Sequence, residues 1–392
     1  MSKIEKTKKN ILDAINHVEP EKVPVIFSTT SGVPMRYAGV DYDEIALDPA
    51  AVCDAFCKIF DVLPTDAMIT TNTENAPYKG LQTMELMTFI ISRDHTTVVH
   101  DQTNQPFFGE DVYDEIIADA GKFITKTYPE FKFPYLKEKS REEVYGIVKE
   151  AVKTGELMYQ ADQAIADRLR EQYGIYGIDD EMPLYCYSPL DTIFDHIRGI
   201  RGTLLDMRKR PDKLAAACDA LWEYGKDARA YDPADMAEPL PVAGTTFHAE
   251  CFISPKQFER FTLKYLIDGL TPALNAGKKA YVLGEGSIAH VLDLLADTFP
   301  KHSLIVNLDT DDSFEMKKKY GEKLAFITGM DMAILQQGTK EQCLDYVKRV
   351  FNELAPGGGF VFSTNQMMVS GKDVNLENLI AIYQEADRLS RK

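Results

Sequence analysis

Short apolar runs alternate with longer amphipathic stretches through the second half of the chain. Runs such as Lys279–Leu283 and Ser303–Asn307 predict buried strands, and each is followed by a stretch with helical periodicity. The pattern continues through Leu324–Thr328 and Gly359–Ser363. Strands that alternate with helices in this way indicate a parallel sheet covered by helices.

Several helix starts carry a recognisable capping sequence. Ser140, Ser254 and Thr339 are each followed three residues later by Glu or Gln, the spacing of a capping box. Pro255 strengthens the second start, because proline suits the first position of a helix. We therefore expect helices to begin directly after these three residues.

The first half of the chain follows the same pattern less regularly. A helix over residues 7–18 precedes a strand at Val23–Phe27, and further strands are predicted at Asp66–Thr70 and Met182–Ser188. Between about 80 and 180 the alternation fails. There the runs TMELMTFIISRD and HTTVVHDQT predict a hairpin, and two helices follow, the first reaching Thr154 and the second covering Gln160–Tyr173.

Counting these units gives the predicted architecture. Four strand–helix units follow residue 279, one covers 241–268 and about three precede it, which makes the eight of a closed barrel. We therefore expect an α/β fold, a single (β/α)8 TIM barrel domain over 1–392. It would carry an N-terminal helical extension, an insertion around 80–180 and a β-excursion within that insertion.

Charge and composition exclude several classes of function. The 392 residues carry a formal charge of −17 without a Lys/Arg run, so nucleic acid is not an expected partner. No window approaches the roughly 20 apolar residues that span a bilayer, and the first residues lack the apolar core of a secretory signal. Six cysteines in a chain of this length do not indicate a disulfide framework. A cytoplasmic protein is expected, and the sequence leaves open whether it forms a homodimer.

Reactive side chains follow the strand that begins near Pro241. His248, Glu250 and Cys251 place an imidazole, a carboxylate and a thiol within four residues. Zinc takes these ligand types, and a catalytic zinc needs three of them. Glu285, in a Gly-Glu-Gly turn after the next strand, is the best-placed additional ligand. His248, Cys251 and Glu285 are therefore the predicted zinc ligands, with ordinary half-buried side chains as the alternative.

Other strand ends supply the remaining candidates. Asp309 follows a later strand and is predicted, with Glu250, to act as a catalytic acid. A substrate pocket is predicted from four further side chains near strand ends: Tyr187, Asn365, Met367 and Met368. Two adjacent methionines would suit a large flat ligand, although such a pair also serves as core filling.

Longer motifs in the chain are similar to a known superfamily. The stretch FITGMDMAILQQGTKEQCLDYVKRVFNELAPGGGFVFSTNQMMVSGKDVNLENLIAIYQEA and the helix start HAECFISPKQFERFTLKYL resemble the uroporphyrinogen decarboxylase superfamily. KVPVIF and EDVYDEIIADAGKF fit its N-terminal half. The resemblance covers most of the chain, is loose between 80 and 240, and implies a (β/α)8 barrel.

The superfamily contains decarboxylases and cobalamin-dependent methyltransferases. Decarboxylases carry an arginine-rich segment after the first strand, where this chain has FSTTSGVPMRYAG with only Arg36. Enzymes that methylate coenzyme M carry His-x-Cys and a further Cys, where this chain has Gly284-Glu285-Gly286 and Gly358. Both departures favour the remaining methyltransferase branch, which acts on methyl ethers.

The resemblance therefore implies the first methyltransferase of an O-demethylase system. A methyl group would pass from a methoxylated, aromatic small molecule to the Co(I) corrinoid (cobalamin type) of a separate partner protein, with zinc activating the oxygen. One alternative is a lyase similar to uroporphyrinogen decarboxylase that acts on a carboxylated tetrapyrrole. The other is a non-catalytic barrel that binds a corrinoid or tetrapyrrole.

Overall fold

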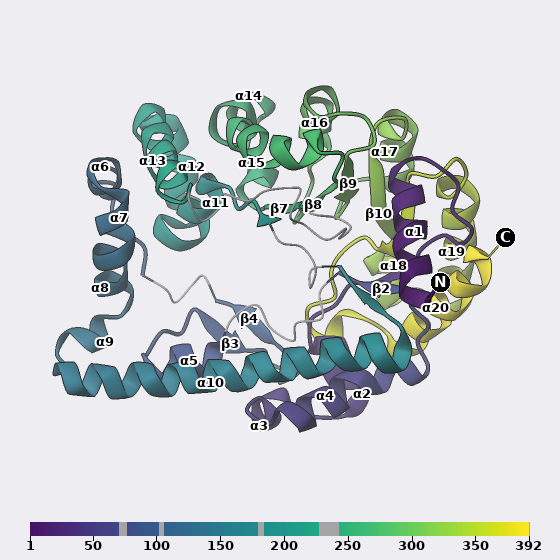
Figure 1. The fold of residues 1–392 in the computed structure, drawn as a ribbon, viewed down its shortest axis with the longest axis horizontal. Helices are drawn as coiled ribbons and strands as arrows, with labels where there is room; N and C mark the ends of the chain where they lie inside the picture. The colour runs from purple at the N-terminus through teal and green to yellow at the C-terminus, as the bar shows by residue number, and fades with distance from the viewer. Residues whose placement is uncertain (70–76, 102–105, 179–183, 227–242, 392) are drawn as a thin grey trace.

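Two parallel sheets form the centre of the protein. The structure is a computed structural model, and it describes residues 1–69, 77–101, 106–178, 184–226 and 243–391. Figure 1 shows the strands at the centre, with helices around them and both termini at one end. The strands are β1 (Ile26–Phe27), β2 (Ala67–Met68), β3 (Phe89–Ile91), β4 (Val98–His100), β5 (Tyr176–Gly177), β6 (Leu184–Tyr185), β7 (Ala243–Phe247), β8 (Ala280–Gly284), β9 (Leu304–Asn307), β10 (Ala325–Met330) and β11 (Phe360–Thr364).

Helices surround these strands and also build a separate arm. In the first half they are α1 (Lys3–Ile15), α2 (Gly32–Ala38), α3 (Tyr42–Ile45), α4 (Pro49–Cys57), α5 (Tyr78–Thr83), α6 (Val112–Ala118), α7 (Ala120–Lys122), α8 (Tyr128–Lys132), α9 (Pro134–Lys137) and α10 (Arg141–Arg168). In the second half they are α11 (Pro189–Thr192), α12 (Gly199–Lys209), α13 (Pro211–Tyr224), α14 (Pro255–Phe258), α15 (Lys264–Asn275), α16 (Leu292–Thr298), α17 (Ser313–Tyr320), α18 (Met332–Gln337), α19 (Lys340–Leu354) and α20 (Leu376–Ser390).

Pairing between neighbouring strands confirms the predicted parallel α/β fold. One sheet has the order β11-β10-β9-β8-β7-β6 and the other the order β1-β2-β5, all parallel. Two isolated parallel bridges, Val25–Phe362 and Thr29–Met368, connect the segment that contains β1 to the segment that contains β11. Residues 179–183, between β5 and β6, lie outside the described residues. The described pairs therefore do not show a closed barrel.

Side chains from both sheets meet in one buried cluster. Ile26 and Ala67 come from the smaller sheet, whereas Tyr281, Ile305 and Ile327 come from the larger one, and all five are almost inaccessible to solvent. Two larger apolar clusters lie between the strands and the outer helices. The two sheets therefore enclose a common interior.

Most elements of the second half are confirmed where the sequence predicts them. α17 has the predicted bounds, and α19 begins after a complete capping box at Thr339. α16 is shorter than the predicted helix, which was to begin at Ser287. Asp311 accepts hydrogen bonds from the Ser287 hydroxyl and from the backbone N–H groups of Ile288 and Ala289 at 2.6–3.0 Å, and these bonds hold the preceding turn outside the helix.

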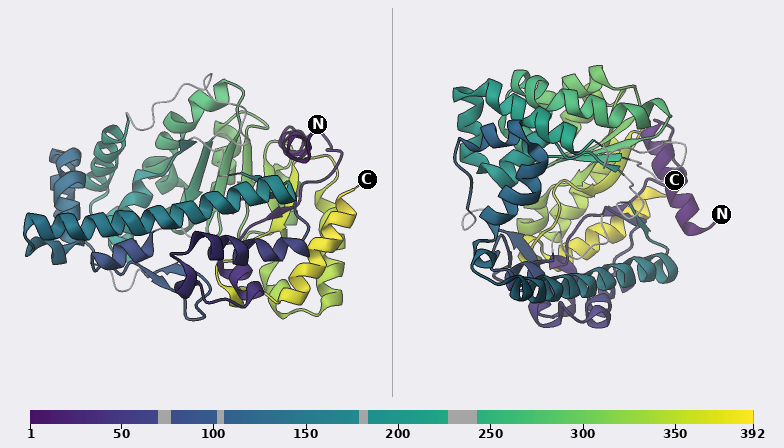
Figure 2. Two further views of the ribbon diagram at one scale, coloured as in Figure 1. Left: turned by 60° about the horizontal axis from the view of Figure 1, so that its bottom comes forward. Right: turned by 60° about the vertical axis from the view of Figure 1, so that its left-hand side comes forward.

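The insertion contains the predicted hairpin but fewer helices after Ser140 than expected. β3 and β4 pair antiparallel, with Phe89 opposite His100. The two predicted helices are wrong as separate elements, because α10 runs without a break for 28 residues from the Ser140 capping box. Figure 2 shows α10 crossing the length of the molecule. The predicted N-terminal helix also begins and ends earlier, as α1.

Asp206 ties the arm of α6–α9 to the rest of the protein. Its buried carboxylate accepts a hydrogen bond from Tyr113 of α6 at 2.9 Å and pairs with Arg198 at 2.7 Å and with Arg210. Arg198 also donates to the carbonyl of Phe108, just ahead of α6. One carboxylate therefore holds α6, α12 and the start of α13 together.

We expect Asp206→Asn to lower the free energy of unfolding by about 3 kcal/mol, because it leaves two arginines without their buried counter-charge. Urea denaturation followed by circular dichroism measures the change. Asp212→Asn is the matched control: Asp212 pairs with Arg260 but its side chain is 95% exposed, and we expect a loss below about 1 kcal/mol. Equal effects of the two substitutions would contradict this account.

Candidate functional site

Four acidic or basic side chains follow the carboxyl ends of four neighbouring strands. Asp195 comes after β6, His248 directly after β7, Glu285 directly after β8 and Asp309 shortly after β9. Because these strands are parallel and adjacent, their carboxyl ends meet at one edge of the sheet. This is the edge at which α/β proteins build their sites.

Strand register places His248 beside Glu285. Phe247 pairs with Gly284 at the last position of the β7–β8 ladder, so the next residue of each strand leaves the sheet at the same level. The His248 Nε2 atom lies 2.9 Å from a Glu285 carboxylate oxygen. The predicted proximity of these two residues is therefore present.

A second carboxylate holds the other side of the His248 ring. Asp195, in the turn Ile193–Ile197 that follows α11, lies 3.0 Å from His248 Nδ1. Tyr187 donates a hydrogen bond to the same carboxylate through its hydroxyl group. The imidazole is thus held between two carboxylates, one on each ring nitrogen.

This arrangement keeps His248 protonated. Burial alone would lower its pKa, but hydrogen bonds to Asp195 and Glu285 outweigh burial and raise the pKa of His248 to about 11. Burial also opposes ionisation of Asp195, yet the hydrogen bond from His248 brings the pKa of that carboxyl below its usual value. At neutral pH the site therefore presents an imidazolium between two carboxylates.

Beneath His248 lies a pair of fully buried carboxyl groups. Glu250 accepts hydrogen bonds from the backbone N–H of His248 at 3.2 Å and from the Thr262 hydroxyl at 2.7 Å. Asp191 accepts the N–H of Ala249 at 2.7 Å, while its Oδ2 atom has no donor among the described residues. The two carboxyl groups are within hydrogen-bonding reach of each other.

This pair shares a proton rather than carrying two charges. Burial, followed by the charge of Glu250, raises the pKa of Asp191 well above its usual value. Burial likewise raises the pKa of Glu250. A proton on Asp191 removes the repulsion between two buried negative charges. Together the carboxyl groups fix the turn that carries His248.

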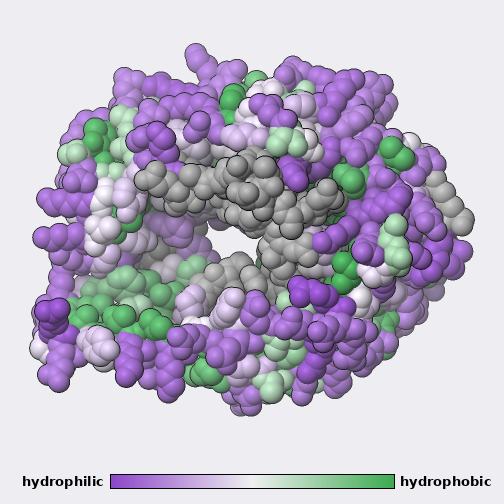
Figure 3. Space-filling view, viewed as in Figure 1, coloured by the Kyte–Doolittle hydropathy of each residue, from purple (hydrophilic) through white to green (hydrophobic). Residues whose placement is uncertain are grey.

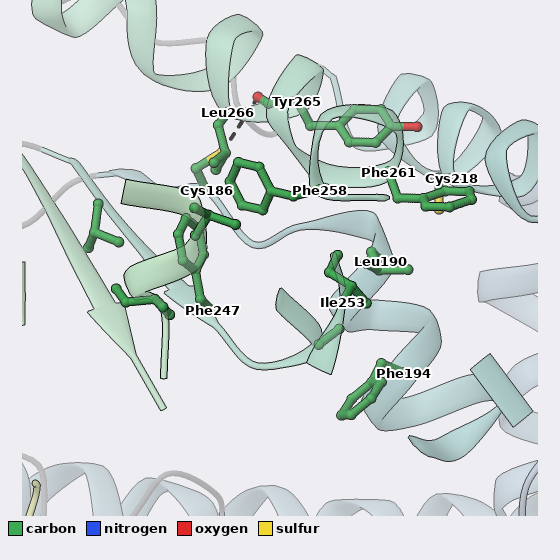
Figure 4. Close-up of a cluster of buried hydrophobic side chains, with 14 of the residues drawn as sticks. Cys186, Leu190, Phe194, Cys218, Phe247, Ile253, Phe258, Phe261, Tyr265 and Leu266 are labelled. Atoms are coloured by element: carbon green, nitrogen blue, oxygen red, sulfur yellow. Dashed lines mark hydrogen bonds between the residues drawn. The ribbon is translucent and has the colours of Figure 1, made fainter. Parts of the chain in front are cut away.

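Apolar side chains pack around the same turn. Figure 4 shows Phe247 and Ile253, which precede and follow it, among Leu190, Phe194 and Phe258. The Phe194 ring lies 5.8 Å from the His248 ring and 5.8 Å from the ring of Phe252, which is 58% exposed. One aromatic ring, that of Phe194, thus lies beside the imidazolium, and the Phe252 ring stacks on Phe194.

Cys251 lies next to the Glu285 turn. Its thiol donates to the carbonyl of Phe247 at 3.3 Å, and a side chain at Gly286 would come within 3.2 Å of the sulfur. Gly286 also has a φ of 150°, which disfavours other residues. Burial and the nearby carboxylates raise the pKa of Cys251 to about 12, so its sulfur is a thiol at neutral pH.

The three predicted zinc ligands are neighbours, but their side chains are not arranged around a common point. His248 and Glu285 are in contact and Cys251 is their neighbour, and all three donor types suit zinc. Within the described residues, however, no group of three or more His, Cys, Asp or Glu side chains is placed to hold one ion. His248 has a carboxylate on each ring nitrogen, so the arrangement fits a proton better than a metal.

Asp309 and Asn365 border the cluster on its other side. The Asp309 Oδ1 atom is buried without a hydrogen-bond partner among the described residues, and burial raises the pKa of this carboxyl. Asn365 donates to the backbone carbonyl of Asp309 at 2.8 Å and accepts the N–H of Met332 at 3.0 Å. Asn365 therefore holds the backbone around Asp309.

The two predicted methionines differ in their surroundings. Met367 is partly exposed. Met368 is fully buried in an apolar cluster with Phe27 and Phe362, and its backbone N–H donates to the carbonyl of Ser28 at 3.1 Å. Met368 is thus placed as a core residue, in agreement with the alternative for this pair.

Several residues near His248 are missing from the sequence prediction. Asp191 lies in α11 and Asp195 in the helical turn that follows it. His196 and His100 are close enough to His248 for their charges to interact. The ring centroids of His100 and His196 are 6.3 Å apart. Ser188-Pro189, a clear helix start, could have indicated Asp191, whereas no local pattern indicates His100 in the hairpin.

Comparison with known proteins shows the fold. Among solved structures, the chain is similar to a methyltransferase from Methanosarcina mazei, with a TM-score of 0.59 and 15% sequence identity over 97% of this chain and 98% of that chain. At this identity the likeness establishes a shared fold alone. No protein-family model and no curated protein matches the chain. None of the helices that the structure describes is long and apolar enough to cross a bilayer.

We expect the NMR signal of His248 to report a charged ring from pH 6 to pH 9, because its pKa of about 11 lies above this range. Its contribution to stability is then complete below about pH 6.5, the ordinary histidine value, and is lost as the pH rises towards 11. Glu285→Gln should lower the pKa by removing one counter-charge. A neutral His248 at pH 7 in the unmodified protein would contradict the described charge state.

Proposed function

We propose that the chain is a methyltransferase that removes a methyl group from a methoxylated aromatic molecule. The proposed acceptor is a corrinoid carried by a partner protein, which supplies a nucleophilic Co(I) centre. The observation that carries the proposal is the imidazolium of His248, held between Asp195 and Glu285 where four strands end. The fold shared with a methyltransferase supports it.

The main contribution of the protein to the proposed reaction is a proton for the oxygen that leaves. The corrinoid would supply the nucleophile that takes the methyl carbon, and the carbon–oxygen bond of the substrate would break with both electrons left on the oxygen. His248 Nε2 donates its proton to that oxygen, so that the product leaves as a phenol. Asp195 and Glu285 hold the ring, and the Glu285 contact gives way to the substrate oxygen. General acids placed in this way accelerate reactions by about 10²–10⁴-fold.

The acidity of His248 suits an aromatic ether. A phenol has a pKa of about 10. The pKa of His248 is about 11 with both carboxylates in place and falls when the substrate oxygen takes the place of Glu285, so the ring can pass its proton to a phenolate. The oxygen released from an aliphatic ether is far more basic. The rings of Phe194 and Phe252 support the same substrate class, because aromatic rings favour stacked or edge-to-face partners.

Other predicted residues take different parts in this proposal. Glu250, predicted as an acid, is fully buried and bonded to the His248 backbone, which suits a positioning role. Asp309, whose pKa is raised by burial, is the second acid of the site. Tyr187 orients Asp195, and Met367 is proposed to line the pocket.

Two finer statements about the protein belong to this proposal. The common interior of the two sheets supports their closure into one (β/α)8 barrel. All six cysteines are free, which supports a reducing, cytoplasmic setting. Zinc at His248, Cys251 and Glu285 remains a prediction, and no step above passes through it.

The charge of the site disfavours the lyase alternative. A carboxylated tetrapyrrole would meet two carboxylates, Asp195 and Glu285, and the acid Asp309 around a single imidazolium. A chain with a net charge of −17 adds to this repulsion. A non-catalytic carrier would have no need of an imidazolium with a raised pKa, because binding requires no proton transfer.

We expect His248→Gln to reduce methyl transfer by at least about 100-fold, because glutamine can donate a hydrogen bond but not a proton. The assay measures release of phenol from methoxylated aromatic ethers with added Co(I) corrinoid. Lys256→Gln, a nearby charge change on α14, is the control and should retain activity. Unchanged turnover in His248→Gln would contradict the role of His248 as the proton donor.

Metal analysis of the purified protein separates the acid from a zinc mechanism. If His248 acts as a proton donor, full activity should survive removal of zinc by a chelator. The opposite result would be one bound zinc per chain, with both the zinc and the activity lost in Glu285→Gln. That result would show that a Lewis acid, not a proton from His248, activates the oxygen. No methyl transfer from any methoxylated or methylamine donor would remove the proposed function.

A further inference from the structure

The long helix α10 exposes an apolar stripe. Tyr145, Val148, Val152 and Tyr159 are 69%, 39%, 54% and 64% exposed, respectively. Their spacings of three, four and seven residues place all four side chains on one side of the helix. Figure 3 shows hydrophobic residues gathering at the lower left, where the N-terminal half of α10 and its neighbours lie.

The rest of the protein does not use this side of α10. The buried residues of the helix, including Ala151, Met158 and Ile165, face α4 and α5 instead. A helix that covers a sheet needs only one apolar side, so a second apolar stripe indicates a second packing partner. The spacing of the stripe is that of a coiled-coil seam, which another helix would fill.

Charges beside the stripe suit a second copy of the same helix. Lys149 and Glu156 lie along one flank of the stripe, seven residues apart, and neither forms an ion pair within the part of the chain that the structure describes. If two α10 helices pack antiparallel about a point near Val152, Lys149 faces Glu156 of the partner subunit. Two-fold symmetry then forms the same pair twice.

We propose that the α10 stripe is the interface of a homodimer, in which the α10 helices of two copies pack antiparallel near Val152. The stripe supplies the apolar seam, and the two symmetric Lys149–Glu156 pairs set its register. No residue of α10 belongs to the His248 cluster. The proposal therefore stands apart from the proposed methyl transfer and can be tested without it.

Sedimentation of the full chain tests the interface. The unmodified protein should sediment with about twice the 44.1 kDa mass of one chain. Val152→Lys, which places a charge in the seam, should sediment as a single chain with an unchanged circular dichroism spectrum. Ile267→Lys changes an equally apolar side chain that is 40% exposed on α15, and this control should remain dimeric.

Charge reversal tests the antiparallel register. Lys149→Glu and Glu156→Lys should each raise the dimer dissociation constant at least about fivefold, because each places like charges together at two symmetric positions. The double variant Lys149→Glu/Glu156→Lys restores opposite charges and should dimerise like the original. A monomeric unmodified protein, a dimeric Val152→Lys or a double variant weaker than both single variants would overturn the proposal.

Discussion

The site depends on the parallel ladder between β7 and β8. Its register aligns Phe247 with Gly284, so that His248 and Glu285 leave the sheet side by side. Asp195 then approaches from the turn after the neighbouring strand. A partly buried imidazolium is costly unless counter-charges surround it, and the buried carboxylate of Asp195 is costly without the imidazolium. His248 and Asp195 therefore stabilise each other, and the more exposed Glu285 adds a second counter-charge.

The turn beneath this group has its own support. Two fully buried carboxyl groups, Asp191 and Glu250, accept the backbone N–H groups of Ala249 and His248. Backbone groups at the end of a strand have no ladder partner, so buried acceptors satisfy them and fix the direction of the His248 side chain. One shared proton lowers the electrostatic cost of placing two carboxyl groups together.

The sequence predicts the parts of this arrangement that follow from strand order. Alternating strands and helices indicate the parallel sheet, and consecutive strand ends bring His248 and Glu285 together. Asp195 is not predictable in this way, because it lies eight residues beyond Tyr187 and reaches the site through the path of a turn. Similarly, Gly155 resembles a break between two helices, yet α10 continues through it. A Cβ atom on Gly155 would lie 3.6 Å from Pro77, an ordinary contact distance, so this position packs on the segment before α5 without requiring glycine.

Asp206 has a mechanical consequence for the chemistry of the site. It binds the α6 arm through Tyr113 and binds Arg198, which lies three residues after the Asp195 that holds His248. Arg198 in turn donates a hydrogen bond to the carbonyl of Phe108, just ahead of α6. A docking protein that displaces the α6–α9 arm would shift the segment that carries Asp195 and weaken the hydrogen bond between Asp195 and the His248 imidazole. Contact at a distant surface would thereby retune the acidity of His248.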